Sequence, residues 1–229
     1  MMRPHRGPRA VTIGRRIVAL AVIGVFTVLM GGCAMFDKIG NMHRELDNPH
    51  QSQTLHGEQE IQLIDSMRAK GSYEAARERL TDTARVIGER VSDAVPGQTW
   101  TFDDDPYAQE AYRDGSLCEK LDADVARRPE AKRVGFGATF SAEGFRTAAA
   151  IVREEAAKYG ATDESSLFDE PAKREYRVQG KGYEFRFMQM KFAALFITGD
   201  CFLLQKVIDS PPGQLPPGST TAPPIPPGR

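Results

Sequence analysis

The N-terminal end of this chain has the pattern of an export signal, which limits where the folded part can begin. Residues 1–32 contain five arginines and no acidic residue, and an apolar run of 14 residues spans positions 17–30. Gly31 and Gly32 follow this run, directly before Cys33. A basic start, a short apolar stretch and small residues at its end are typical of a secretory signal peptide. The run is shorter than the roughly 20 residues that a membrane-spanning helix needs, so we expect the folded domain to begin beyond residue 32.

Cys33 stands where the cleavage site falls, as in a lipobox, in which signal peptidase cuts before a cysteine that carries acyl chains such as palmitate. We therefore predict that residues 1–32 are a lipoprotein signal peptide and that Cys33 is lipidated. This lipid is expected to anchor the protein to the extracytoplasmic face of the cell membrane. Met30 departs from the usual Leu, Val or Ile at its position. An ordinary cleaved signal with a chance cysteine is the alternative.

The charge of the remaining chain excludes some classes of partner. Subtracting the five arginines of residues 1–32 from the 30 basic residues leaves 25 against 31 acidic ones, a net charge of −6. Nucleic-acid binding needs clustered Lys and Arg to neutralise phosphates, so we expect no nucleic-acid partner. Overall charge does not favour binding to anionic lipid either. We expect attachment to the plasma membrane through the lipid on Cys33.

Two further cysteines, Cys118 and Cys201, lie in the exported part of the chain. An even pair in an oxidising compartment predicts a disulfide. The bridge would close a loop of about 80 residues, for which the chain-entropy model gives about 4 to 5 kcal/mol as an upper limit. Two buried thiols are the alternative.

Composition divides the rest of the chain into three parts. Residues 33–56 are polar and lack periodicity, which predicts a flexible tether behind the lipidated cysteine. In residues 57–209 the apolar residues recur at helical and strand spacings, which predicts one globular domain. Residues 210–229 are dominated by Pro, Gly, Ser and Thr, which predicts a disordered tail.

Helical spacing comes first within the predicted domain. It recurs over residues 61–67, over 73–94 with Ser72 as N-cap, and over 141–159 before Gly160. Strand patterns occupy residues 98–102, 133–140, 176–178, 183–187, 191–198 and 201–204. After Phe187 the alternation changes parity, which indicates either a bulge or a strand covered on both faces. The pattern predicts an α+β fold: an antiparallel twisted sheet with helices packed on one face and one disulfide.

Several long segments carry a resemblance to a known family. They are GEQEIQLIDSMRAKGSYEAARERL, PGQTWTFDDDP, FGATFSAEGF, IVREEAAKYGATDESSLF and ITGDCFLLQK. In this order they resemble the LppA/LppB lipoproteins of mycobacteria, and Cys33, Cys118 and Cys201 fall in segments where that family has its cysteines. The resemblance implies a location on the outer face of the plasma membrane in an actinobacterial envelope. It implies no catalytic residue.

Histidine placement argues against an enzyme. All four histidines lie before residue 57: His5, His43, His50 and His56. The predicted domain therefore lacks the commonest general base and metal ligand, and a disulfide would remove both cysteines as nucleophiles. We predict a non-enzymatic protein without cofactor, metal or catalytic residues.

Carboxylates are the remaining candidates for metal ligands or catalytic acids in the predicted domain. Asp103, Asp104 and Asp105 form a cluster that resembles a calcium ligand set, but the spacing, glycine and glutamate of an EF-hand are absent. We expect a cap followed by a solvated turn. Paired acids for glycoside hydrolysis would need Glu184 beside one of these aspartates, and their separation is not fixed by the sequence.

Aromatic and methionine side chains gather near the end of the domain. The simpler interpretation is the core of the sheet. The alternative is a curved sheet around an apolar cavity for an acyl chain or an envelope glycolipid. In that case the candidate pocket residues are Trp100, Phe187, Met190 and Phe196.

The sequence therefore favours a lipid-anchored envelope protein that acts as a non-enzymatic binding module for a partner protein or an apolar envelope ligand. A carboxylate-based hydrolase of the envelope and a purely structural surface antigen are the alternatives.

Overall fold

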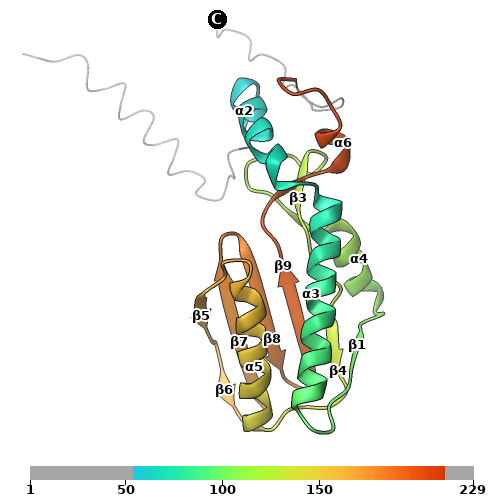
Figure 1. The fold of residues 1–229 in the computed structure, drawn as a ribbon, viewed down its shortest axis with the longest axis vertical. Coiled ribbons are helices and arrows are strands. Elements are labelled where there is room, and N and C mark those ends of the chain that lie inside the picture. The colour runs from blue at the N-terminus through green and yellow to red at the C-terminus, as the bar shows by residue number, and fades with distance from the viewer. Residues whose placement is uncertain (1–53, 215–229) are drawn as a thin grey trace, which may run out of the picture. The chain divides into compact units, whose positions relative to one another are not determined.

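The structure is a computed structural model that describes residues 54–214 (Figure 1). Its helices are α2 (Glu58–Met67), the 3₁₀ turn η1 (Arg68–Lys70), α3 (Tyr73–Ala94), α4 (Pro106–Asp114), α5 (Ala142–Ala157) and α6 (Gln205–Ile208). The predictions for the signal peptide, for Cys33, for most of the tether and for the tail beyond residue 214 lie outside the described residues. None of the helices within residues 54–214 is long and apolar enough to cross a membrane.

Antiparallel pairing joins all the strands of two sheets. The larger sheet has the order β1-β4-β9-β8-β7-β5, and β6 also pairs with β7. Its strands are β1 (Trp100–Phe102), β4 (Val134–Phe136), β5 (Asp163–Ser165), β6 (Asp169–Glu170), β7 (Lys173–Gly180), β8 (Tyr183–Gln189) and β9 (Ala193–Thr198). The smaller sheet has the order β10-β3-β2, with β2 (Ser116–Leu117), β3 (Ala126–Arg128) and β10 (Phe202–Leu203).

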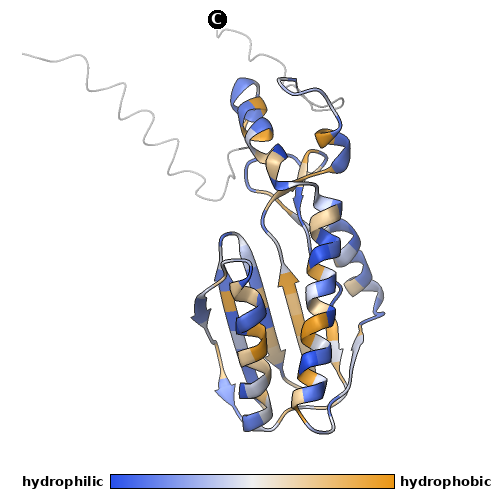
Figure 2. Ribbon diagram, viewed as in Figure 1, coloured by the Kyte–Doolittle hydropathy of each residue, from blue (hydrophilic) through white to orange (hydrophobic). Residues whose placement is uncertain are grey.

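Helices α3 and α5 lie side by side on one face of the larger sheet (Figure 1). Both begin as their sequences predict, because Ser72 and Ser141 accept hydrogen bonds from main-chain N–H groups three residues on. Their apolar stripes cover alternate residues of β7, β8 and β9, and β9 is the most continuously apolar strand (Figure 2). The α+β class with an antiparallel sheet and helices packed on one face is confirmed.

The strand predicted over residues 133–140 ends early, at Phe136. Two glutamine side chains bind the main chain that follows. Gln98 donates to the carbonyl of Ala138 at 2.7 Å and accepts from its N–H at 3.3 Å. Gln189 bonds both main-chain groups of Phe140. Side-chain amides thus replace a strand partner here, which buried main-chain groups require.

The parity change after Phe187 is explained by one of these glutamines. Pairing of β8 with β9 continues without a bulge through Met188 opposite Ala194 and Gln189 opposite Ala193. Gln189 therefore occupies the inner face, where it is 2% exposed. The sequence pattern looked broken because the inner position holds a polar residue.

The smaller sheet has its own apolar cluster with α2 and α6. Its buried members include Ile64, Leu121, Val125, Leu203 and Val207. Helix α4 and strands β2 and β3 were not predicted. Asp105 caps α4 by accepting from the N–H groups of Tyr107 and Ala108, so the expected cap is present, but a helix follows it instead of a solvated turn.

Candidate functional site: the cavity beside the disulfide

The four candidate pocket residues do not line one cavity. Phe187 is fully buried beneath α5, where its ring stacks on Phe145 at a centroid distance of 4.6 Å. Phe196 pairs with Arg186, whereas Phe187 pairs with Leu195. Because successive strand residues point to opposite faces, Phe187 and Phe196 lie on opposite sides of the sheet.

Trp100 and Met190 are also separated from such a pocket. Trp100 packs on Gly88 of α3, where an added Cβ would lie 2.6 Å from the indole ring. Met190 follows β8 and is 43% exposed. The prediction of one pocket lined by these four residues is therefore wrong, because strand alternation places their side chains in different environments. Phe187 belongs to the core, as the simpler interpretation expected.

A cavity of about 500 Å³ lies elsewhere, against the disulfide. It is formed by the α2–η1 segment, by the end of β2 and the residues that follow it, by Arg128 of β3, by the β7–β8 turn and by the connection from β9 to β10. Its apolar wall consists of Leu63 and Met67 from α2, of Leu121, and of Cys118 with Cys201. Leu63 and Met67 are four residues apart and therefore share one side of the helix.

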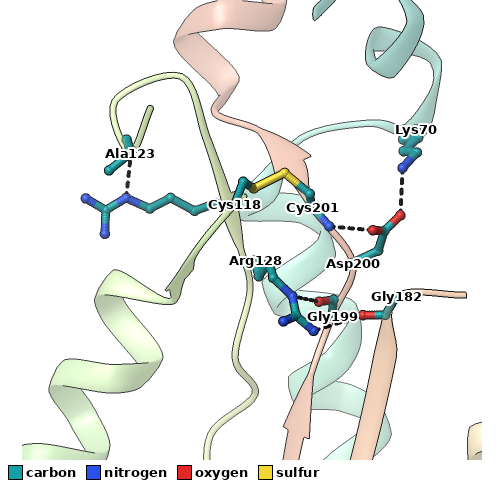
Figure 3. Close-up of a disulfide and its surroundings, with 9 residues drawn as sticks. Lys70, Cys118, Ala123, Arg128, Gly182, Gly199, Asp200 and Cys201 are labelled. Carbon is teal, nitrogen blue, oxygen red and sulfur yellow. Dashed lines mark hydrogen bonds and ion pairs between the residues drawn. A yellow bond between two sulfur atoms is a disulfide. The ribbon is translucent and has the colours of Figure 1, made fainter. Parts of the chain in front are cut away.

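The disulfide between Cys118 and Cys201 is present, with a Cα–Cα distance of 5.8 Å. It joins the chain just after β2 to the residue just before β10 (Figure 3). Cys118 is buried and Cys201 is partly buried. Because 83 residues separate the two cysteines, the bridge holds together cavity walls that are remote in the sequence.

Charged groups surround the cavity (Figure 3). Lys70 forms an ion pair of 2.6 Å with Asp200. The other carboxylate oxygen of Asp200 accepts from the N–H of Cys201 at 2.7 Å. Arg128 donates from Nε to the carbonyl of Gly199 at 3.0 Å and from Nη2 to the carbonyl of Gly182 at 3.1 Å. These contacts fix both carboxylate and guanidinium in the cavity wall.

Asp103 of the acidic cluster is held by contacts with neighbouring residues. Asp103 accepts from Nε of Arg133 at 2.7 Å and from the N–H of Asp105 at 2.9 Å. Burial alone raises the pKa of Asp103, but the Asp105 N–H and the Arg133 guanidinium outweigh it, so the pKa lies below the ordinary 3.8. Glu184 lies on β8 with an oxygen 3.7 Å from Nε of Arg177. Within residues 54–214 no group of three His, Cys, Asp or Glu side chains is placed to hold a metal ion.

Two of the residues around the cavity, Cys118 and Cys201, could be identified from the sequence. Lys70, Arg128 and Asp200 could not, because they come from segments that meet only in the folded chain. The cysteine pair was the one available signal, since it predicts which two segments lie together.

The profile of a family described as "Lipoprotein confined to pathogenic Mycobacterium" matches residues 48–205. The chain belongs to the LppA lipoprotein family. Lipoproteins LppA and LppB of Mycobacterium tuberculosis strain H37Rv are each 64% identical to it over 217 residues, which cover 95% of this chain and 94% of theirs.

A solved member supports the fold. The crystal structure of lipoprotein LppA from Mycobacterium tuberculosis superposes with a TM-score of 0.69 at 69% identity. The match covers 99% of the crystallised LppA chain and 77% of this one.

Proposed function

We propose that the protein is a lipid-anchored binding module on the extracytoplasmic face of the cell membrane, and that the cavity beside the disulfide binds a small envelope molecule of mainly apolar character. The observation that carries this proposal is the cavity itself. Its volume of about 500 Å³ falls within the range of about 300–1,000 Å³ that is usual for small-molecule sites. An apolar wall with a few fixed polar groups is also usual for such sites.

A preformed cavity favours binding, because less conformational freedom is lost when the ligand enters. Four contacts hold the cavity walls in place: the disulfide, the ion pair of Lys70 with Asp200, and the two carbonyl contacts of Arg128. Each of them crosses between segments that are remote in the sequence. Ligand entry therefore requires no ordering of these walls.

The position of the cavity in the chain suits an anchored protein. Helix α2 supplies one wall and is the first helix within residues 54–214. Glu58 is 25 residues beyond Cys33 in the sequence, a distance that the chain can extend over no more than roughly 90 Å. The cavity would therefore stay within reach of the membrane that supplies its ligand.

Native mass spectrometry tests the proposal directly. The soluble chain of residues 34–229 is incubated with a lipid extract of a mycobacterial envelope and transferred to the spectrometer under non-denaturing conditions. We expect one retained adduct per chain, which tandem dissociation releases as a small molecule. An unmodified mass at all ligand concentrations would overturn the proposal.

A second candidate function, docking of a partner protein, is favoured by a separate surface. Phe192 is 59% exposed and Met190 43% exposed. Phe192 borders a hollow of about 380 Å³ whose floor includes the small residues Gly135 and Ala194. Exposed aromatic and methionine side chains are enriched in protein interfaces. Affinity capture from an envelope extract would then retain a protein on the wild-type chain and lose it with Phe192→Ser.

A further inference from the structure

The charged side chains around the cavity differ in whether an opposite charge lies within ion-pair distance. Lys70 is neutralised by Asp200 at 2.6 Å. Lys120 and Glu119 lie at the rim and are exposed to solvent. Arg128 is partly buried in the wall and has no carboxylate oxygen within 4.0 Å among residues 54–214. An anionic ligand could therefore contact the Arg128 guanidinium without displacing a carboxylate from it.

Two main-chain carbonyls hold the Arg128 guanidinium in place. Nε and Nη2 donate to Gly199 and Gly182, and Nη1 makes no hydrogen bond to any residue that the structure describes. Carbonyl oxygens orient a guanidinium but leave its full positive charge. Asp163 and Glu184 line the adjoining hollow of about 330 Å³ with Arg128, and their oxygens stay beyond ion-pair distance. The arrangement presents a fixed cation with free donors, which suits carboxylate or phosphate oxygens.

Apolar side chains line the same cavity. Met67 and Leu121 are buried in its wall. Leu117 also lines the cavity and leaves 69% of its surface exposed. An exposed leucine beside a cavity offers apolar surface to a hydrocarbon chain that extends outward. Apolar wall and fixed cation together match a molecule with one apolar part and one anionic group.

Resting on the proposed function, we infer that the cavity selects anionic amphiphiles, whose phosphate or carboxylate contacts Arg128 while their hydrocarbon chain lies along Met67, Leu121 and Leu117. Lys120 at the rim adds a second positive charge near the same group. The selectivity is local, since the domain as a whole is acidic. It comes from one oriented guanidinium and not from a basic surface.

Isothermal titration of the soluble chain of residues 34–229 tests this selection with probes that share one hydrocarbon chain. The probes are dodecyl phosphate, dodecyl maltoside and dodecyltrimethylammonium, each below its micelle concentration, and inorganic phosphate alone. We expect dodecyl phosphate to bind at least about tenfold more tightly than the maltoside, as one additional charged contact of about 1.4 kcal/mol would give. The ammonium probe and inorganic phosphate are expected to bind more weakly than dodecyl phosphate.

Variants test which positive side chain causes the preference for dodecyl phosphate over dodecyl maltoside. In Arg128→Gln the ratio of the two affinities, phosphate over maltoside, should fall most, and in Lys120→Gln it should fall by a smaller factor. Lys191→Gln, an exposed lysine away from the cavity, should keep the ratio. Because Arg128→Gln also removes two carbonyl contacts, the ratio is measured on the folded fraction, and the exposed Lys120 provides a second test that leaves the fold unchanged.

The outcomes separate this inference from the function on which it rests. Equal binding of the phosphate, maltoside and ammonium probes would overturn the selection of anions but keep the binding cavity. If inorganic phosphate bound as tightly as dodecyl phosphate, the site would be a simple anion site, and the inferred selection of amphiphiles would be overturned. An unchanged ratio in both Arg128→Gln and Lys120→Gln would overturn the assigned contacts. No binding of any amphiphile would overturn the proposed function as well.

Discussion

Gln189 satisfies both main-chain groups of Phe140: its side-chain oxygen accepts from the Phe140 N–H, and its amide donates to the Phe140 carbonyl at 3.3 Å. Arg174 makes a longer contact of 3.4 Å with the same carbonyl. Gln189 is almost completely buried on the inner face of β8. A buried polar side chain thus fixes the chain where β4 has ended and α5 is about to begin.

Replacing Gln189 with leucine should destabilise the fold. The variant keeps a side chain of similar size but leaves the Phe140 N–H buried without an acceptor, which costs about 1–3 kcal/mol. Urea denaturation followed by circular dichroism measures the loss. Gln179→Leu on the neighbouring strand β7 is the matched control, because Gln179 is exposed, and should change the unfolding free energy by less than about 0.5 kcal/mol. Equal effects of both changes would contradict this role of Gln189.

Removing the disulfide should have the larger effect on stability. The double variant Cys118→Ala, Cys201→Ala frees a loop whose ends are 83 residues apart, so the unfolding free energy should fall by about 2–5 kcal/mol. Urea denaturation of the chain of residues 34–229 measures this change. Adding a reductant should destabilise the wild-type chain and leave the double variant unaffected. If reductant shifted the urea unfolding transitions of the wild-type chain and of the double variant equally, the stabilising role of the disulfide would be contradicted.

The carboxyl of Glu60 makes stability depend on pH. Burial raises its pKa above the ordinary 4.5, Asp122 and Asp124 raise it further, and His56 opposes them. A raised carboxyl pKa means that the folded chain binds the proton more tightly than the unfolded one. The resulting cost is absent below about pH 4.5, grows as pH rises through the window up to the folded pKa, and then stays constant.

Glu60→Gln should therefore raise the melting temperature at pH 7, and the gain should disappear near pH 4. Thermal unfolding at both pH values measures the difference from the wild-type chain. A gain from Glu60→Gln that is equal at pH 4 and pH 7 would show that the carboxyl is not the cause.

Lipidation is predicted at Cys33, which lies outside the described residues. Metabolic labelling with an alkyne analogue of palmitate should mark the full-length protein in the membrane fraction. Cys33→Ala should lose the label and move out of that fraction. Cys118 and Cys201 serve as internal controls, since both are bonded in the disulfide. A label that persists in Cys33→Ala would place the lipid elsewhere.

Local sequence signals were sufficient for much of the fold. Ser72 and Ser141 mark helix starts by a mechanism that operates within three residues. The β7–β8 hairpin follows from alternation on both sides of a glycine-containing turn, in which Gly182 has a φ of 82°. These elements are long or carry distinctive turn residues, so neighbours along the chain determine them.

Elements without such signals were missed. Helix α4 is nine residues long and buries only Ala108, so its apolar side is too short to stand out in the sequence. Strands β2 and β3 are two and three residues long, too short for alternation to be visible. Lys70 and Asp200 are 130 residues apart, and no periodicity relates them. The cavity could not be predicted for the same reason, since it exists only where five separate segments meet.

The most direct test of the central claim is to fill the cavity without disturbing the core. Ser66 lines the cavity and is exposed on α2, whereas Gln62 lies one turn earlier, is also exposed and does not line it. Ser66→Trp and Gln62→Trp are compared with the wild-type chain by native mass spectrometry after incubation with the envelope lipid extract. We expect a retained adduct on the wild-type chain and on Gln62→Trp, and its loss from Ser66→Trp. An adduct that Ser66→Trp retains at the same occupancy would contradict the claim that the cavity beside the disulfide is the binding site.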